Sequence, residues 1–482
     1  MTLGENLRAL RKEAGLSQEE VAGQLYVSRQ TISKWENNLA EPGVENLKAL
    51  AKLYGITLDQ LLGEEVRQDP PDLSEADLSQ GQQESGDGSY LICTGVLLVL
   101  IAVRAVFTLD VYSSINIPFS LAAMVVGIWV RHPAVWVVVQ CLLGLNAVLA
   151  FLSLFFGSFL LGRFAVAPGT LFRILWDALR EWVCKLFGAE VPGELYSGQE
   201  KAVVLNIRLP RVALSALVGA GLSVAGTAYQ GMFRNPMVSP DILGASNGAG
   251  FGAALGILLS FNYFGVTVSA FVCGVGAVAL AWCISRASRM NGTLAMVLAG
   301  IVVGSLFSAG TSFIKLVADT EQQLPAITYW LMGSLSSAKT RDLQFALIPA
   351  LIGMVPLFLL RWRINLLTLG EEEARSLGVH TTRLRLVIVV CATLITSACV
   401  SVSGMIGWVG LVIPHFARML FGHDYKRLIP ASMLLGGAFL MVVDNIARLA
   451  TSGEIPLGIL TSVVGAPVFV WLILRGGADR EH

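Results

Sequence analysis

The sequence predicts an all-α protein with a small helical domain at its N-terminus, a linker, and a polytopic membrane domain of about twelve helical spans. Hydrophobic residues make up 54% of the 482 residues and charged residues only 14%, against about 25% in soluble proteins. The mean hydropathy is +0.67. Apolar runs of about 18–25 residues, each long enough to cross a bilayer, recur from Tyr90 to the C-terminus.

Residues 66–89 separate two unlike parts of the chain. The segment is rich in Pro, Gly, Ser, Gln and acidic residues and contains no aromatic residue. A segment of this composition buries too little apolar surface to fold, so we expect a disordered linker. Residues 1–65 before it are polar and helix-periodic. The sequence after it is apolar, which places the membrane domain entirely on the C-terminal side.

The N-terminal residues 1–65 predict five short helices. Ser17, followed three residues later by Glu20, predicts a capping box at the start of the second helix. Ile32 and Trp35 are expected on the inward face of the third helix, and the segments VENLKALAKLYG and TLDQLLG predict the last two. The run SQEEVA…VSRQTISKWENN resembles the phage-repressor type of helix-turn-helix DNA-binding domain.

That resemblance implies that the third helix enters the major groove of DNA. The residues that would read bases are Arg29, Gln30, Ser33 and Lys34, with Ser17 and Gln18 touching the DNA backbone or a flanking base. Arginine and glutamine carry the donors that guanine and adenine require. Residues 1–65 nevertheless hold seven Lys and Arg against ten Asp and Glu, which weakens attraction to phosphates. A helical module that no longer binds DNA is the alternative.

The apolar runs predict where the spans lie. We expect them at about 90–109, 114–130, 135–161, 212–231, 242–260, 264–284, 294–316, 343–361, 385–402, 405–421, 430–449 and 458–475. The first two form an extra hairpin within residues 90–133, and the last ten form one domain, residues 134–482. Basic residues gather in alternate loops: Arg131, Arg234, Arg286, Arg289, Arg361, Arg363, Arg375, Arg383, Arg385, Arg418, Lys426, Arg427 and Arg475. By the positive-inside rule, both termini are expected in the cytoplasm.

The sequence predicts neither a metal site nor a directly bound cofactor. Six of the seven cysteines stand in apolar stretches, and no CxxC or CxxxH spacing occurs. No GxxxxGK[ST] phosphate-binding loop is present, so the chain is not expected to be an enzyme that hydrolyses ATP. The spans also lack the series of Asp, Glu and His that relays protons in ion-driven carriers. Energy for any transport is therefore expected from a partner.

Small residues and prolines mark the stretch 206–256. Glycines recur there at helical spacing, which allows close helix packing, and Asn235-Pro236 and Ser239-Pro240 break the chain between two spans. This stretch, the later segments SVSGMIGWVGLVIPHFARMLFGHDYKRLIPASMLLGGAFLMVVDNIARLA and EIPLGILTSVVGAPVFVWLILRGG, and the loop LTLGEEEARSLGVHTTRLR resemble the FecCD family of ABC importer permeases. Members of that family carry ferric siderophores, haem or cobalamin.

The resemblance extends from about residue 140 to 477 and implies several partners. These are a second permease subunit, identical or paralogous, a dimer of ATPase subunits that binds the ATP, an extracytoplasmic substrate-binding protein, and the lipid bilayer. It implies ten helices per subunit with both termini inside. The loop residues that would couple to the ATPase are Gly370, Glu372, Ala374, Leu377 and Gly378. Further positions that match the permease motifs are Asn235, Pro236, Pro240, Gly244, Pro414, His415, Arg418 and Asp444.

Arg208 and Arg211 stand three residues apart at the expected outer end of a span that begins near Pro210. The resemblance implies that they dock carboxylates of the substrate-binding protein, with Arg448 as a third docking arginine. Interfacial arginines that extend toward the lipid headgroups are the alternative for the first two. Asp444 stands four residues before Arg448 on the same helix face, so an internal ion pair is also expected there.

Two short segments, LAGI (298–301) and WLMGSL (330–335), are candidates for lining the transport pathway, because they too resemble the family. A different function is also open: a membrane-anchored transcriptional regulator whose permease-like domain senses the substrate. A third possibility is a fused helix-turn-helix passenger without a role in transport.

Overall fold

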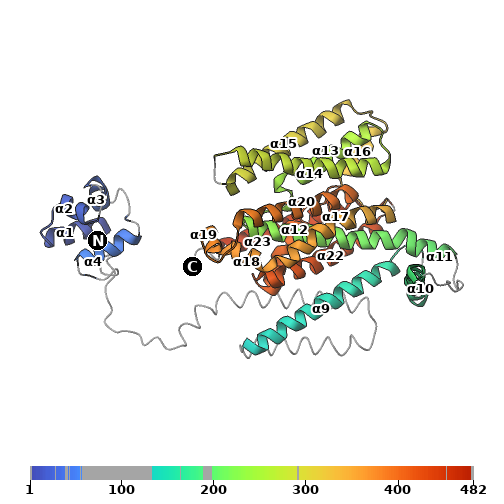
Figure 1. The fold of residues 1–482 in the computed structure, drawn as a ribbon, viewed down its shortest axis with the longest axis horizontal. Helices are drawn as coiled ribbons and strands as arrows, with labels where there is room; N and C mark the ends of the chain where they lie inside the picture. Colours follow the sequence, from blue (N-terminus) through green and yellow to red (C-terminus); the bar gives the residue numbers. More distant parts are fainter. Residues whose placement is uncertain are drawn as a thin grey trace. The chain divides into compact units, whose positions relative to one another are not determined.

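The computed structural model describes residues 3–25, 27, 29–37, 42, 44–54, 56, 133–162, 164, 166–187, 198–289, 292–451 and 453–478. The expected linker, the extra hairpin up to residue 132 and the expected fifth helix of the N-terminal domain lie outside these residues. The chain divides into two compact units, Met1–Glu84 and Ser85–His482. Every regular element within the described residues is helical, which confirms the predicted all-α fold class (Figure 1).

The N-terminal unit contains four described helices: α1 (Leu3–Glu13), α2 (Gln18–Gln24), α3 (Arg29–Glu36) and α4 (Val44–Tyr54). The predicted capping box at the start of α2 is present. The Ser17 hydroxyl accepts a hydrogen bond from the Glu20 amide at 3.2 Å, and the Glu20 carboxylate accepts one from the Ser17 amide at 2.7 Å. Ile32 and Trp35 are buried in one core with Leu7, as their spacing predicts.

The second unit contains ten apolar helices among the described residues, one for each span expected from residue 135 onward. They are α9 (Pro133–Leu160), α12 (Leu209–Phe233), α13 (Ala245–Leu258), α14 (Tyr263–Ala287), α15 (Gly292–Val317), α17 (Thr340–Leu359), α20 (Thr381–Ser403), α21 (Val409–Phe421), α22 (Tyr425–Ala450) and α23 (Leu457–Ala478). Among the described residues, six helical segments have the length and composition to cross a membrane, and three shorter apolar stretches lie in α9, α21 and α23. Helix α13 has only 14 residues, so it spans about 21 Å.

Shorter elements connect these helices. They are α10 (Pro168–Phe187), α11 (Gly198–Ala202), α16 (Gln323–Leu331), α18 (Arg361–Leu369) and α19 (Glu371–Ser376), a π-helical turn η1 (Val203–Arg208) and a 3₁₀ helix η2 (Pro240–Leu243).

Helix α12 begins at Leu209 with Pro210 in its first turn, as expected, but further helical turns precede it. The helix continues backward without a break through η1 and α11 to Gly198. A proline inside an α-helix removes one backbone donor and its ring crowds the preceding turn. The turn before Pro210 is instead π-helical, and the Leu209 amide bonds the carbonyl five residues back, at Val204. This wider turn accommodates the proline within a continuous helix.

Helix α10 lies in the long segment between the first two helices of this unit and was not anticipated. Its Leu171 and Ile174 are fully buried in a cluster that includes Phe159 of α9. Phe172 and Trp176, on another face, are 55% and 66% exposed. Charged residues interrupt the apolar pattern too often for a membrane span, which explains why a search for long apolar runs passes over it.

Glycines allow the central helices to pack closely. Helices α12 and α22 run side by side, and α12 also packs on α20 and α21 (Figure 1). A Cβ atom on Gly219 would overlap the carbonyl of Gly436 on α22, and one on Gly226 would overlap the carbonyl of Gly410 on α21. Close backbone approach therefore accounts for these two glycines, as expected for small residues at helical spacing.

Candidate functional site

The chain between α12 and α13 is built from the motif residues Asn235, Pro236, Pro240 and Gly244. Helix α12 ends at Arg234, and the Asn235 side-chain oxygen accepts a hydrogen bond from the Met237 amide at 2.9 Å. Pro240 opens η2, where its missing N–H has no helical partner to lose. Gly244 ends η2 with φ +84°, a left-handed conformation that favours glycine.

This broken segment reaches the interior of the membrane unit. Gly300 and Gly304 stand eight and twelve residues after Gly292, the start of α15, which is about 12 and 18 Å along that helix. A Cβ on Gly300 would overlap the carbonyl of Ile242, and one on Gly244 would lie 3.2 Å from the Gly304 nitrogen. The end of η2 therefore packs against the middle of a membrane-length helix. Irregular backbone at such depth is tolerated where it is buried in protein or lines a cavity.

A cavity of about 560 Å³ lies beside this segment. Asp241, Ser246 and Asn247 line one part of it, and residues 331–332, 405–407, 458–459 and 462–463 line the rest. Backbone hydrogen bonds join these other walls: the Ser334 amide donates to the Ser403 carbonyl at 2.8 Å, and the Gly458 amide to the Met332 carbonyl at 3.1 Å. The volume falls within the range of small-molecule sites, about 300–1,000 Å³.

The two candidate pathway segments meet this cavity differently. Leu331 and Met332 of WLMGSL line it directly. LAGI does not line the cavity, but its Gly300 packs on η2, which lies beside the cavity. Sequence reasoning missed Asp241, although an acidic residue within an apolar stretch is a signal for function in membrane proteins.

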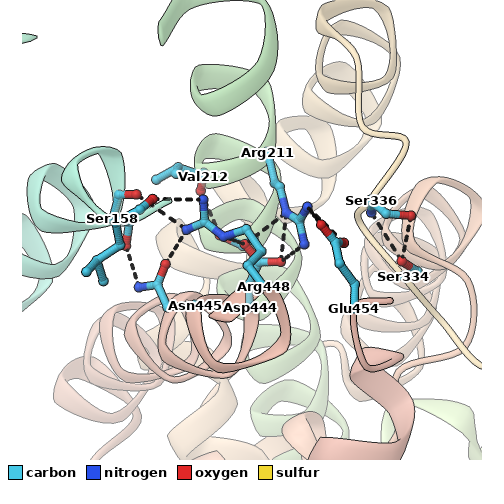
Figure 2. Close-up of polar contacts among 11 residues, drawn as sticks. Ser158, Arg211, Val212, Ser334, Ser336, Asp444, Asn445, Arg448 and Glu454 are labelled. Atoms are coloured by element: carbon cyan, nitrogen blue, oxygen red, sulfur yellow. Dashed lines mark hydrogen bonds and ion pairs between the residues drawn. The ribbon is translucent and has the colours of Figure 1, made fainter. Parts of the chain in front are cut away.

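The docking arginine Arg211 forms a buried ion pair with the motif residue Asp444 (Figure 2). Its Nη2 lies 2.9 Å from Asp444 Oδ1 and its Nε lies 3.2 Å from Oδ2, so the contact is bidentate. Nη1 donates to Glu454 at 3.1 Å. The side chains of Arg211 and Asp444 are 9% and 1% exposed. This pair joins α12 to α22, and sequence reasoning did not find the Glu454 partner.

The other two arginines predicted to dock the binding protein also have internal partners, and Arg208 is buried while Arg448 is half-buried. Arg448 Nε lies 3.3 Å from Asp444 Oδ2, which confirms the ion pair expected from their spacing. The guanidinium of Arg448 also donates to the Ser158 carbonyl at 3.3 Å (Figure 2). Arg208 donates to the backbone carbonyls of Phe159 and Phe164. The three arginines thus tie α9, α12 and α22 together, and their docking role stays a prediction.

The motif residues Pro414, His415 and Arg418 lie on α21. Arg418 donates to the side-chain oxygen of Gln230 near the end of α12. The Gln230 amide nitrogen in turn donates to the Val238 carbonyl at 3.1 Å and lies 3.4 Å from that of Leu411. Arg418 therefore fixes the broken segment before η2 through Gln230. His415 is half-buried, and nothing in its surroundings indicates chemistry.

The expected coupling residues form a compact projection around α19. Gly370 precedes the helix with φ +146°, and a Cβ there would overlap the Glu373 carboxylate. Gly378 follows it with φ +81°, and its amide donates to the Arg375 carbonyl at 2.9 Å, so a glycine caps the end of the helix. Ala374, on the inner face of α19, is fully buried.

Ion pairs hold this projection in place. Glu371 pairs with Arg375 at 2.7 Å and with Arg385 of α20 at 3.1 Å. Glu372 is exposed, and Leu377 is 59% exposed. An exposed leucine between two conformationally restricted glycines is available to contact another protein.

In the N-terminal unit, three of the four expected base-reading residues point away from the core. Arg29, Gln30 and Lys34 are exposed on α3, and Ser33 is half-buried. Gln18 donates a hydrogen bond to Glu36 at 2.9 Å, and its expected contact with DNA stays a prediction.

Comparison with known proteins gives these features a family. Residues 148–475 match the FecCD transport family, and residues 7–61 match a helix-turn-helix family. The chain belongs to the FecCD transport family. It is an ABC-transporter permease of the metal-chelate type with a helix-turn-helix domain at its N-terminus, and it is a multi-pass membrane protein.

Relatives of this FecCD permease are named for different substrates. It is 37% identical to the molybdate import permease MolB of Haemophilus influenzae, over 66% of this chain and 92% of that protein. It is 43% identical to a probable iron chelatin permease of Helicobacter pylori, over 57% and 82% of the two chains. A solved inward-facing structure of a putative metal-chelate type ABC transporter matches with a TM-score of 0.55 and 38% identity, and covers 64% of this chain and all of that one.

Proposed function

We propose that this permease carries a metal chelate, of the iron-siderophore, haem or cobalamin type, into the cytoplasm. The observation that carries the proposal is the cavity of about 560 Å³ beside a broken segment at the depth of mid-α15. Relatives are named for iron chelatin, cobalamin and haemin transport. A cavity of this size among membrane helices suits a stage in the passage of such a molecule.

The energy for transport comes from a separate ATPase, because the sequence contains no phosphate-binding loop. Two ATPase subunits would contact the projection from Gly370 to Gly378 on each of two permease subunits. Closure of the ATPases around ATP moves this projection, and α20 transmits the movement through the Arg385–Glu371 ion pair, which links it to α19. The buried Ala374 and the restricted Gly370 make the projection rigid enough to act as a lever.

Orientation and delivery follow from the same proposal. Both termini lie in the cytoplasm, because the basic loops alternate as the positive-inside rule requires. An extracytoplasmic binding protein delivers the chelate at the end of the bundle that holds Arg208, Arg211 and Arg448. These arginines bond partners inside the protein. They would therefore hold the helices that form the docking surface in place and also add positive charge to it.

The N-terminal domain is proposed to bind DNA through α3. Arg29, Gln30 and Lys34 are exposed on one helix, with donors suited to base edges. Binding of operator fragments by the full chain in detergent, compared with an R29A/Q30A variant, tests this point. Equal binding by both would contradict it.

Uptake in cells distinguishes transport from regulation. A strain that lacks this gene is complemented either with the full chain or with residues 131–482, and uptake of radioactive iron is measured from a panel of siderophores. Equal uptake by both chains would make the permease the function and the helix-turn-helix domain a separate regulator or a passenger. No uptake by either, with promoter occupancy that still depends on residues 1–65, would favour the membrane-anchored regulator.

A further inference from the structure

Helix α10 has an apolar face that no other described part of the chain covers. Phe172, Trp176, Leu179 and Val183 follow one another at spacings of four, three and four residues, so they form one stripe along the helix. All four side chains are exposed, as is that of Phe187 at the end of the helix. A contiguous stripe of large exposed apolar side chains marks an interaction surface.

The other side of α10 fixes the helix to the bundle. Leu171 and Ile174 are fully buried in the cluster that also contains Val204 of η1. At the surface, Glu181 Oε2 lies 3.6 Å from Lys201 Nζ of α11. Helix α10 therefore packs at the end of α9 and against the turns that precede α12 (Figure 1). The exposed stripe consequently has a fixed direction.

The stripe continues the apolar outer side of α9. Helix α9 has 28 residues, none of them charged, and spans about 42 Å, close to the thickness of a bilayer with its headgroups. Its exposed side chains Leu145, Val148, Leu152 and Phe156 lie along one face. The rings of Phe156 and Phe172 are in contact, with centroids 5.7 Å apart. The exposed stripe of α10 thus joins a surface that faces lipid.

The same contact gives the depth of α10. Phe156 stands four residues before Leu160, where α9 ends, which is about 6 Å along the helix. Phe172 therefore lies within about one helical turn of the end of a membrane helix. Interfacial helices lie with their apolar face about 5–10 Å into the boundary between headgroups and acyl chains, so the two depths agree.

The composition of α10 suits that boundary and excludes a span. Five of its 20 residues are charged, too many for the hydrocarbon core. Arg173 and Arg180 are exposed and directly follow the stripe residues Phe172 and Leu179. Long arginine side chains beside an apolar face extend towards headgroup phosphates, and tryptophan is enriched at this level of the membrane.

We propose that α10 is an interfacial helix whose exposed stripe is embedded in phospholipid, in the leaflet on the side of Arg208, and that it braces the start of α12 there. In the proposed orientation this is the outer leaflet. The lipid contact depends on the membrane location of the chain and not on transport. Arg208 donates to the carbonyl of Phe164, in the connection from α9 to α10, so a helix held by lipid also steadies the end of α12 that carries the docking arginines.

The competing occupants of the stripe are another segment of this chain, a second protein such as the binding protein, and water. Lipid is favoured because the stripe is continuous with an uncharged membrane helix. A soluble partner that dissociates would leave large apolar side chains in water between encounters, which is unfavourable.

The first experiment identifies the occupant by photo-crosslinking in native membranes. In the full chain, p-benzoylphenylalanine replaces Leu179 on the stripe, Leu152 on the exposed face of α9, or Leu377 on α19. The three leucines are all exposed, and Leu377 is the control outside the bilayer. After irradiation, mass spectrometry of the peptides identifies what each position has bonded. We expect phospholipid adducts at positions 179 and 152 and none at position 377.

Each other result at position 179 overturns the lipid contact. A crosslink to another segment of the chain or to a second protein would assign the stripe to that occupant. No adduct at position 179, with phospholipid on position 152, would show that the stripe faces water. Because the readout needs no uptake, an importer that fails to transport while position 179 bonds phospholipid would contradict the proposed transport function and leave this inference standing.

The second experiment tests the brace in the full chain in liposomes. W176E/L179E places two carboxylates in the boundary, and W176L/L179F is the matched apolar control. Amide hydrogen exchange across residues 198–208, which form α11 and η1, should rise several-fold in W176E/L179E and stay unchanged in the control. Unchanged exchange in a folded W176E/L179E chain would contradict the brace. If that variant does not fold, the photo-adducts still decide the lipid contact, since they need no charged substitution.

Discussion

Arg211 and Asp444 form a bidentate ion pair between α12 and α22, with the closest nitrogen–oxygen distance 2.9 Å and side chains 9% and 1% exposed. Asp444 also lies 3.3 Å from Arg448 Nε. One carboxylate thus balances two buried cations, while Arg211 has a second carboxylate in Glu454 at 3.1 Å. The two members of the pair are therefore unequal: loss of Asp444 takes the ion-pair partner from Arg448 as well, whereas loss of Arg211 leaves Asp444 paired with Arg448.

Asp444→Ala is predicted to destabilise the protein more than Arg211→Ala. Removing one partner of a buried pair costs about 3–5 kcal/mol because a charge is left uncompensated. Loss of Asp444 removes the ion-pair partner of Arg448 and leaves Arg211 with Glu454, whereas loss of Arg211 leaves Arg448 to balance Asp444. Thermal unfolding of the full chain in detergent measures the order, with the exposed Glu321→Ala as control. Equal unfolding temperatures for the two variants would contradict this arrangement.

Gly219→Ala is predicted to disrupt the packing of α12 on α22. The added Cβ would overlap the carbonyl of Gly436 and approach Leu440, and overpacking of this kind costs about 1–3 kcal/mol or more. Gly276→Ala on α14 is the matched control, because nothing lies within 4 Å of its added Cβ. The control should be neutral or stabilising by about 0.5–1 kcal/mol. Similar losses of folded protein on size-exclusion chromatography for both variants would refute the close helix contact.

The N-terminal domain is predicted to lose stability in acid partly through Glu36. Burial acts to raise the pKa of Glu36, but hydrogen bonds from Arg11 at 2.5 Å and Gln18 at 2.9 Å outweigh it and hold the pKa below its ordinary value. A lowered folded-state pKa gives stability that is present above the unfolded value, about 4.3, and is lost as the pH falls through the folded value.

Denaturant unfolding of residues 1–84, with and without Glu36→Gln, tests this linkage. These residues form a compact unit with its own core. At pH 7 the variant should be less stable by about 1–3 kcal/mol, since hydrogen bonds to a charged group are lost. The difference should shrink towards pH 3. A difference that stays constant with pH would show that the ionised carboxylate is not what stabilises the domain.

Leu377→Ala is predicted to weaken coupling without unfolding the chain. Leu377 is 59% exposed, so its truncation should change stability by no more than about 0.5 kcal/mol. At an interface, loss of a central apolar contact costs more than about 1 kcal/mol, and we expect roughly tenfold slower ATP-driven uptake. Leu259→Ala is the matched control, because Leu259 is 55% exposed but ends α13. Equal uptake by the two variants would contradict the coupling role.

The sequence and the structure agree where long-range packing is not needed. Ser17 with Glu20 identifies its capping box from local geometry alone, and the apolar runs give ten helices from residue 135 onward. Pro210 stands in the first turn of α12, as its sequence predicts, but proline rules do not anticipate the π-helical turn that precedes it. The Arg448–Asp444 pair follows from a four-residue spacing on one helix.

The remaining features depend on segments distant in sequence. Glu454 reaches Arg211 only because α12 and α22 pack together. Asp241 looks from its sequence like one acid in a loop between two spans. Its place beside a cavity appears only when η2 packs against the middle of α15, through the contact between Ile242 and Gly300. No local pattern encodes that depth.

The most direct test of the account is ATP-dependent uptake by the full chain reconstituted in liposomes with its ATPase and binding protein. We predict that a radioactive metal accumulates inside when it is supplied as a chelate with ATP on the ATPase side, and that it does not accumulate without ATP. A correctly assembled complex that hydrolyses ATP but accumulates no chelate, or that accumulates molybdate in its place, would contradict the account.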